Sequence, residues 1–215
     1  MKREKIEGKS GQDSSGLDTR GHGTRGRDTR AGNCTRLFEA DTMEWFTHIN
    51  PITVAVIWSL VIVYFGNRTW QLRESLSAPL AVAAFLIGWF LWTFAEYSLH
   101  RFVLHYRPRS ERGKQIAFYL HGVHHSEPMC KTRLVLPLPA SIPLMALFYG
   151  IFLTLGSSVP GREVLVNPFF AGFVFGYLFY DMLHYSIHHL LKNTQHMKEL
   201  RVHHLRHHGE SSELR

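Results

Sequence analysis

Histidines are the residues of this chain most able to do chemistry. Thirteen of the 15 histidines lie between His100 and His208, and most of them fall into four short groups, each beside a long apolar stretch. Imidazole is the commonest metal-binding side chain and suits iron, zinc, copper and nickel. Because four groups offer more nitrogen ligands than one ion can use, the pattern favours two ions. The groups are His100 and His105; His121, His124 and His125; His184, His188 and His189; and His203, His204, His207 and His208.

The motif His-x-x-His-His occurs twice, beginning at His121 and at His204. Its offsets of three and four residues place the side chains on one face of a helix. His184 and His188 are one helical turn apart. In contrast, His100 and His105 are five residues apart and match one helical face poorly, so we expect the helix to end or bend between them.

Spacing reduces the thirteen histidines to ten predicted ligands. His189 and His203 stand next to better-spaced partners, and His22, His48 and His196 are isolated enough to be ordinary polar side chains. The ten that remain are His100, His105, His121, His124, His125, His184, His188, His204, His207 and His208.

Acidic and aromatic residues accompany these groups. The face of His184 and His188 continues backward to Asp181 and Tyr177. An ionisable residue at the end of an apolar segment is costly unless it is paired. Asp181 could bind metal directly or accept the second N–H of a ligating imidazole, and we favour the second role. Glu96, four residues before His100, is equally suited to that role and to a salt bridge with an arginine such as Arg101.

Four apolar segments position the histidines: residues 52–65, 79–99, 134–155 and 166–183. A hydrocarbon core of about 30 Å needs roughly 20 apolar residues per helix. The last three segments qualify as membrane spans, and the first is marginal. Buried helices of a soluble bundle are the alternative, but those would show a polar face, which these segments lack.

The distribution of lysine and arginine predicts the topology. If all four segments span, the N-terminal region, the 100–133 loop and the C-terminal region share one side and hold 21 basic residues, against three on the other side. The positive-inside rule therefore places this side, with every histidine group, in the cytoplasm. The membrane would be the bacterial inner membrane or the endoplasmic reticulum. The same asymmetry explains the net charge of +7 without nucleic acid.

Residues 1–42 differ from the rest of the chain. They are polar, glycine-rich and basic, and they carry too little apolar surface to offset the entropy of folding, so we expect disorder. Met43 would make a natural start, and we hypothesise that this tail is an artefact of the assigned start site. The two cysteines, Cys34 and Cys130, lie far apart in no Cys-x-x-Cys pattern, so we expect two buried thiols without a role.

Several classes of metal protein are disfavoured. No His-Glu-x-x-His motif of zinc hydrolases occurs. Structural zinc sites usually take four ligands, often including cysteine, and ten histidines exceed that number. Transporters place their ligands near the middle of the span, whereas nearly all histidines here lie beyond the apolar runs. A nitrogen-rich centre for two metals beside a bilayer suggests activation of dioxygen against a lipid C–H bond, although composition alone does not establish this step.

The motifs resemble those of the fatty acid hydroxylase superfamily, and within it the fatty acid 2-hydroxylases. The resemblance covers residues 43–208 and is carried by EYSLHRFVLH at 96–105, HGVHH at 121–125, YDMLHYSIHH at 180–189 and HLRHH at 204–208. It implies an all-α membrane fold of four transmembrane helices with a cytosolic helical cap around a dinuclear histidine site. The ten predicted ligands match the family's ligands, and Tyr180, Asp181 and Tyr185 match polar residues beside the metals.

The implied reaction inserts one oxygen atom from dioxygen at C2 of a long fatty acyl chain. Two metal ions would serve it, iron by the resemblance, with zinc as the alternative. Many relatives begin with a cytochrome b5-like domain, whereas the N-terminal region here has no haem-binding histidine pair. Electrons would then come from a separate cytochrome b5-like or ferredoxin-like donor. Relatives also continue after the last histidine motif, so we expect the short tail 209–215 to reflect a truncated C-terminus.

We therefore predict a membrane-bound, diiron-type lipid hydroxylase, with fatty acyl 2-hydroxylation as the favoured reaction. Three alternatives remain open. One is a sterol-type desaturase or hydroxylase that acts on another lipid. The second is a membrane protein that binds metal without redox chemistry. The third is an inactive, truncated relative.

Overall fold

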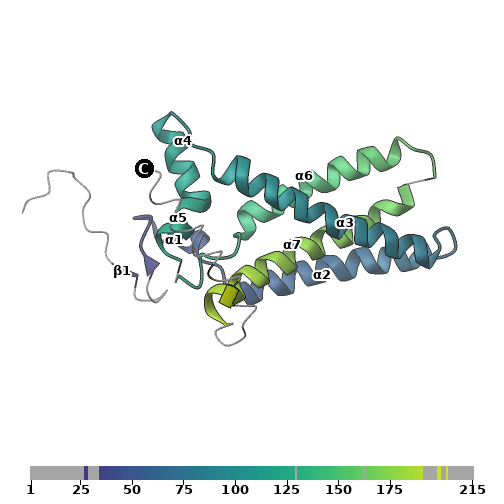
Figure 1. Cartoon of the computed structure of the whole chain (residues 1–215), viewed down its shortest axis with the longest axis horizontal. Helices are drawn as coiled ribbons and strands as arrows, with labels where there is room; N and C mark the ends of the chain where they lie inside the picture. The colour runs from purple at the N-terminus through teal and green to yellow at the C-terminus, as the bar shows by residue number, and fades with distance from the viewer. Residues whose placement is uncertain are drawn as a thin grey trace, which may run out of the picture.

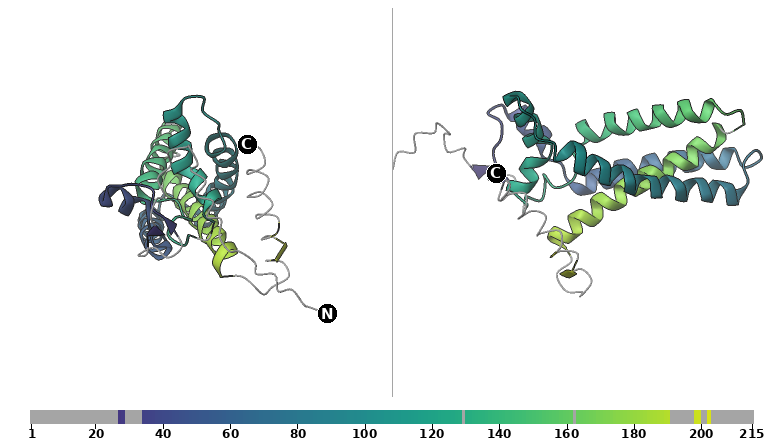
Figure 2. Two further views of the ribbon diagram at one scale, coloured as in Figure 1. Left: turned by 90° about the vertical axis from the view of Figure 1, so that its left-hand side faces the viewer. Right: turned by 45° about the horizontal axis from the view of Figure 1, so that its top comes forward.

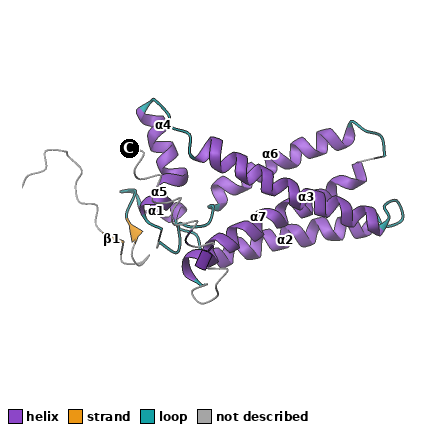
Figure 3. Ribbon diagram, viewed as in Figure 1, coloured by secondary structure: helices purple, strands orange, loops and turns teal. Residues whose placement is uncertain are grey.

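The computed structural model describes residues 27–28, 34–128, 130–161, 163–190, 198–199 and 202. Four long helices form an elongated bundle, and shorter helices gather at one end of it (Figures 1 and 3). The described strands are one antiparallel pair of two residues each, β1 (Arg27–Asp28) and β2 (Cys34–Thr35). The short helices are α1 (Asp41–Thr47), α4 (Glu111–Ala117) and α5 (Val123–Ser126), the last two joined by the π-helical turn η3 (Phe118–Gly122).

The long helices confirm the prediction of four segments able to cross a membrane. They are α2 (Pro51–Gln71), α3 (Ala78–Ser98) continued by the π-helical turn η2 (Leu99–Leu104), α6 (Leu138–Ser157), and α7 (Val166–His189), preceded by the 3-10 turn η4 (Glu163–Leu165). The chain reverses direction at each connection. The N-terminal segment, the 105–137 connection and the end of α7 therefore lie at the same end of the bundle (Figure 1).

Local sequence signals fix where these helices begin. The Asn50 side chain accepts a hydrogen bond from the backbone N–H of Ile52, and Pro51 occupies the first helical position of α2. Helix α6 begins at Leu138 rather than at 134, after Pro137, and Pro139 falls in its first turn, where a missing N–H costs no hydrogen bond. Helix α2 runs six residues beyond the predicted end, because its last turns hold polar residues that the apolar pattern excluded.

Helix α7 is the central helix of the bundle, with buried positions from Val166 to His188. It packs closely against both α2 and α3. Two glycines allow the contact with α3: a Cβ atom on Gly172 would collide with the backbone carbonyl of Phe85, and one on Gly88 with that of Phe169. By contrast, α2, α3 and α6 expose many large apolar side chains, as expected of helices that face lipid.

The segment from Cys34 to Ile49 packs against the connection that follows α5. Both carboxylate oxygens of Glu127 accept hydrogen bonds from the backbone N–H of Thr35, at 3.0 and 3.1 Å. Arg133 is buried and pairs with the carboxylates of Glu44 and Glu127. Burial raises the pKa of Glu44, but hydrogen bonds from the N–H groups of Phe38 and Leu37 and the charge of Arg133 outweigh it and lower the pKa overall.

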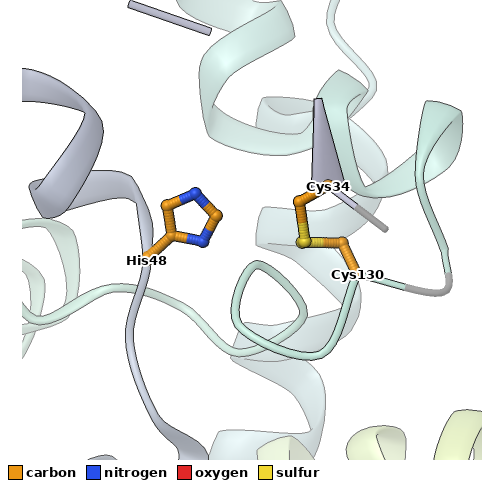
Figure 4. Close-up of side chains that lie close together, drawn as sticks. All are labelled: Cys34, His48 and Cys130. Carbon is orange, nitrogen blue, oxygen red and sulfur yellow. A yellow bond between two sulfur atoms is a disulfide. The ribbon is translucent and has the colours of Figure 1, made fainter. Parts of the chain in front are cut away.

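These contacts correct two expectations. Residues 34–38 are packed rather than disordered: Cys34 and Leu37 are buried, and Arg133 and Glu127 bind the backbone of Thr35. Cys34 and Cys130 are not idle thiols: a disulfide joins them (Figure 4). Sequence spacing gave no hint of this bond, since 96 positions separate the two residues.

Candidate metal centre

The end of α3 presents two histidines in an unusual register. The helix widens into η2 and ends at Leu104, between His100 and His105 as expected, and the backbone N–H of His105 donates to the carbonyl of His100 at 3.1 Å. A π-helical turn has this i to i+5 pattern, so residues five apart come to lie over one another. The two Nε2 atoms are 3.2 Å apart as a result.

Two histidines of the first His-x-x-His-His motif join this pair. The Nε2 atoms of His121 and His125 lie 2.8 Å apart, and the ring of His121 is centred 4.7 Å from that of His100. The ring of His125 is centred 5.1 Å from that of His105. Ligand atoms of His100, His105 and His121 all lie within 4.8 Å of one another. We call His100, His105, His121 and His125 the first histidine group.

His124 belongs to a second histidine group, together with His184 and His188 of α7. Ligand atoms of these three buried residues also lie within 4.8 Å of one another. The predicted stripe on α7 is confirmed, because Tyr177, Asp181, His184 and His188 are all buried. The motif at 121–125 therefore does not serve one site. Successive residues of a helix point about 100° apart, so adjacent His124 and His125 face different groups.

The two groups adjoin, with the rings of His121 and His124 centred 5.8 Å apart. The histidines of the two groups come from η2 at the end of α3, from η3 and α5, and from the end of α7. Burial, together with the neighbouring imidazoles, lowers the pKa of His121 to about 2. A neutral imidazole is the form that binds metal. Two adjoining clusters of imidazole donors are compatible with the binding of transition metals.

Seven of the ten predicted ligands are thus brought together. The other three, His204, His207 and His208, lie outside the described residues. His189, which spacing had excluded, packs against Tyr185 with ring centres 4.9 Å apart.

The three predicted polar neighbours occupy different places. The hydroxyl of Tyr180 donates to the carboxylate of Glu96, and the ring of Tyr180 faces that of His184 at 6.1 Å. Neither predicted role of Glu96, as the partner of a ligating imidazole or in a salt bridge with an arginine, includes this contact with Tyr180. Asp181 is buried, and its Oδ2 atom has no hydrogen-bond partner among the described residues. Tyr185 lies against His189 instead.

Sequence reasoning missed the apolar cavity that leads to the histidines. A cavity of about 830 Å³ lies between α3 and α7, with His100, His105, Glu96 and Tyr180 at one end. The rest of its lining is almost entirely apolar, and includes Leu86, Trp89, Phe90, Gly176 and Phe179. A second cavity of about 440 Å³ is lined by Asp181 and by histidines of both groups. The sequence held no signal for the first cavity: Gly176 lines it, but a Cβ atom there would collide with the Trp92 side chain, so this glycine reflects the close packing of α7 against α3.

Known proteins with related sequences cover most of this chain. The sequence profile of the family described as fatty acid hydroxylase matches residues 85–214. The dihydroceramide fatty acyl 2-hydroxylase FAH1 of Arabidopsis thaliana is 36% identical over 80% of this chain and 70% of its own length. The fatty acid 2-hydroxylase of Mus musculus is 32% identical over 81% of this chain and 51% of its own length.

A solved structure confirms the similarity in three dimensions. The hydroxylase domain of full-length scs7p superimposes with a TM-score of 0.72 at 35% identity, and the match covers 81% of this chain and 64% of that one. The chain spans about half the length of the mouse relative. Sequence and structure agree over the region that carries the histidine groups, and the chain belongs to the fatty acid hydroxylase family.

Proposed function

We propose that this chain is a membrane-bound lipid hydroxylase that inserts one oxygen atom from dioxygen at C2 of a long-chain fatty acyl group. The observation that carries this proposal is the apolar cavity that ends at His100 and His105 of the first histidine group. Relatives named as fatty acid 2-hydroxylases and dihydroceramide fatty acyl 2-hydroxylases support the same position and substrate class.

The direction of the cavity favours reaction near the head of the lipid. Its lining runs along α3 from His100 back to Leu86, about 21 Å at 1.5 Å per residue. An acyl tail inserted from the histidine end would extend toward the membrane interior, while its carbonyl group stays at the interface. C2, the carbon next to that carbonyl, is then the methylene that lies beside the histidines.

The proposed ligands are the ten predicted histidines, including the three outside the described residues. When bound, two iron ions would supply the activation of dioxygen. Burial keeps His121 neutral, and apolar side chains that exclude water line the approach. Asp181 accepts an imidazole N–H, Tyr180 holds Glu96 at the mouth of the cavity, and Tyr185 supports His189. Electrons come from a separate cytochrome b5-like or ferredoxin-like protein.

The histidine groups are proposed to face the cytoplasm. Among the described residues, the 105–137 connection at the histidine end of the bundle carries six basic side chains, and the opposite end carries Arg68 and Arg73, as the positive-inside rule expects. Figure 2 (left) shows the molecule from that end, so the short helices are in front of the long ones. A soluble electron donor could approach this face directly.

Expression in a host that lacks 2-hydroxylated lipids, followed by lipid mass spectrometry under iron-replete conditions, tests the proposal. We expect 2-hydroxylated acyl chains to appear. A desaturated or sterol-type product would assign a different reaction to the site. If protein that carries two metals gives neither an oxygenated nor a desaturated lipid, the proposed redox function is overturned.

Replacement of Asp181 by asparagine is expected to lower metal affinity or activity about 10- to 100-fold, the usual effect of losing a partner of a metal-bound histidine. Asparagine keeps the size of the side chain but removes the negative charge. Metal content by elemental analysis and product by mass spectrometry measure the effect, with thermal unfolding as the check on folding. Unchanged metal affinity and activity in folded protein would remove Asp181 from the site.

Enlarging Leu86 to tryptophan is expected to shift the products toward shorter acyl chains, because the new ring would fill the end of the cavity farthest from the histidines. One methylene in an apolar pocket changes kcat/KM by roughly 10- to 200-fold, so at least a tenfold loss is expected for the longest chains. Leu60→Trp is the matched control, since Leu60 is exposed on α2. The same chain-length profile in both variants would contradict this path for the acyl chain.

A further inference from the structure

A second cluster of metal-binding side chains lies outside the histidine centre. Cys34, His48 and Cys130 come from three distant segments, and their ligand atoms all lie within 4.8 Å of one another (Figure 4). Both cysteines are buried. We propose that, when the cysteines are reduced, these three residues form a site for one zinc ion that fastens the N-terminal segment to the connection after α5.

The distances suit zinc. With Zn–S bonds of about 2.3 Å and Zn–N bonds of about 2.0 Å, neighbouring ligand atoms of a tetrahedral site are about 3.5–3.8 Å apart. The Cα atoms of Cys34 and Cys130 are 5.2 Å apart, so small side-chain rotations separate the sulfurs enough. The Thr132 hydroxyl lies 4.0 Å from Cys34 Sγ, 3.8 Å from Cys130 Sγ and 2.6 Å from His48 Nδ1. It stands beside the fourth position, which a water molecule takes.

His48 is oriented for this role. Its Nδ1 atom faces the Thr132 hydroxyl beside the two sulfurs, and its Nε2 atom lies 3.2 Å from Glu44 Oε1. A carboxylate that accepts the second N–H of an imidazole is the usual partner of a metal-bound histidine. In the disulfide form Arg133 Nη2 donates to Nε2 at 2.8 Å, so the imidazole proton is on Nδ1. Zinc binding at Nδ1 moves this proton to Nε2, which donates it to Glu44, while Arg133 turns away from Nε2 and keeps its pairing with Glu44.

The charges balance in both forms. Two thiolates and one Zn²⁺ ion sum to zero, as does the disulfide, so the buried arrangement of Glu44, Glu127 and Arg133 needs no new partner. Two molecules of a monothiol of the glutathione class break the S–S bond, leaving two protein thiols, and depart joined as one molecule of their own disulfide. Zinc then displaces the two thiol protons.

The cellular compartment decides which form prevails. Disulfides rarely persist in the cytoplasm, where thiols are kept reduced. This step rests on the proposed orientation of the histidine face, since residues 34–49 lie at the same end of the bundle. The site itself does not depend on hydroxylase activity.

Cobalt titration of the full-length protein, reduced with a phosphine, tests the site. Cobalt bound by thiolates gives a sulfur-to-metal charge-transfer band in the near ultraviolet, which imidazole ligands do not. We expect this band at one equivalent, its loss in Cys34→Ser and Cys130→Ser, and its loss when glutathione disulfide reoxidises the protein. His48→Ala should weaken cobalt binding at least tenfold.

Two controls separate this site from the histidine centre. His22→Ala should leave the band unchanged, and so should combined replacement of His124 and His125 by alanine, even though activity is lost. The proposal is overturned if the reduced protein shows no charge-transfer band or if His48→Ala binds cobalt as tightly as the parent. A disulfide that resists reduction in the folded protein would also overturn it.

Discussion

Replacing His124 and His125 together with alanine is expected to abolish hydroxylated lipid while leaving the protein inserted in the membrane. The pair has an unusually large effect because its members serve different groups. His124 contacts His184 and His188, with ring centres 4.7 and 5.2 Å apart, whereas His125 lies against His121. The double variant therefore removes one proposed ligand from each histidine group. Lipid mass spectrometry measures the product, and elemental analysis should show less metal per chain.

The control for this variant is His22→Ala, which removes a histidine that sequence spacing does not count among the ligands and should leave product and metal content unchanged. The separate replacements sharpen the test. His124→Ala should weaken the second group, and His125→Ala the first, so each should lower metal content on its own. Hydroxylated lipid from the double variant at the parental level would show that the centre has been assigned to the wrong residues.

Adding a single methyl group at Gly172 is expected to separate α3 from α7. The new Cβ would collide with the backbone carbonyl of Phe85, which cannot swing aside as a side chain can. Overpacking costs about 1–3 kcal/mol, and we expect Gly172→Ala to reach the upper end of that range. At roughly 2–4 °C per kcal/mol for a chain of this size, thermal unfolding should begin about 6–12 °C lower.

We expect metal binding to weaken together with stability, because η2, which continues α3, carries His100, and α7 carries His184 and His188. Gly150→Ala on α6 is the matched control, since a Cβ at Gly150 meets nothing within 4 Å. That substitution should be neutral or slightly stabilising, as alanine favours helix over glycine. Equal unfolding temperatures for the two variants would contradict the close contact between α3 and α7.

The membrane segments and one half of the site could be predicted from sequence. Apolar length alone located the four long helices, and helical periodicity placed Tyr177, Asp181, His184 and His188 on one buried face. Both predictions depend only on local repeats. The end of α2 was missed because Asn67 and Arg68 interrupt the apolar run. The helix continues past them because a long polar side chain near a helix end can reach toward the interface.

The positions of His100, His105, His124 and His125 depend on backbone geometry, which could not be predicted from the spacing of the histidines. Five-residue spacing puts His100 and His105 together only because η2 forms i to i+5 hydrogen bonds. Likewise, the separation of His124 from His125 follows from where α7 lies relative to α5. Packing of residues 34–38 requires Arg133 and Glu127, nearly a hundred positions away. Such long-range partners cannot be read from local composition.

The most direct test of the central proposal is the fate of dioxygen. Purified protein loaded with two iron ions, given a reductant, an electron donor and a long-chain acyl substrate, would react under isotopically labelled dioxygen. Mass spectrometry of the lipid should find one labelled oxygen atom at C2. Label at another carbon, oxygen derived from water, or an unlabelled desaturated product would contradict the assignment of this chain as a fatty acyl 2-hydroxylase.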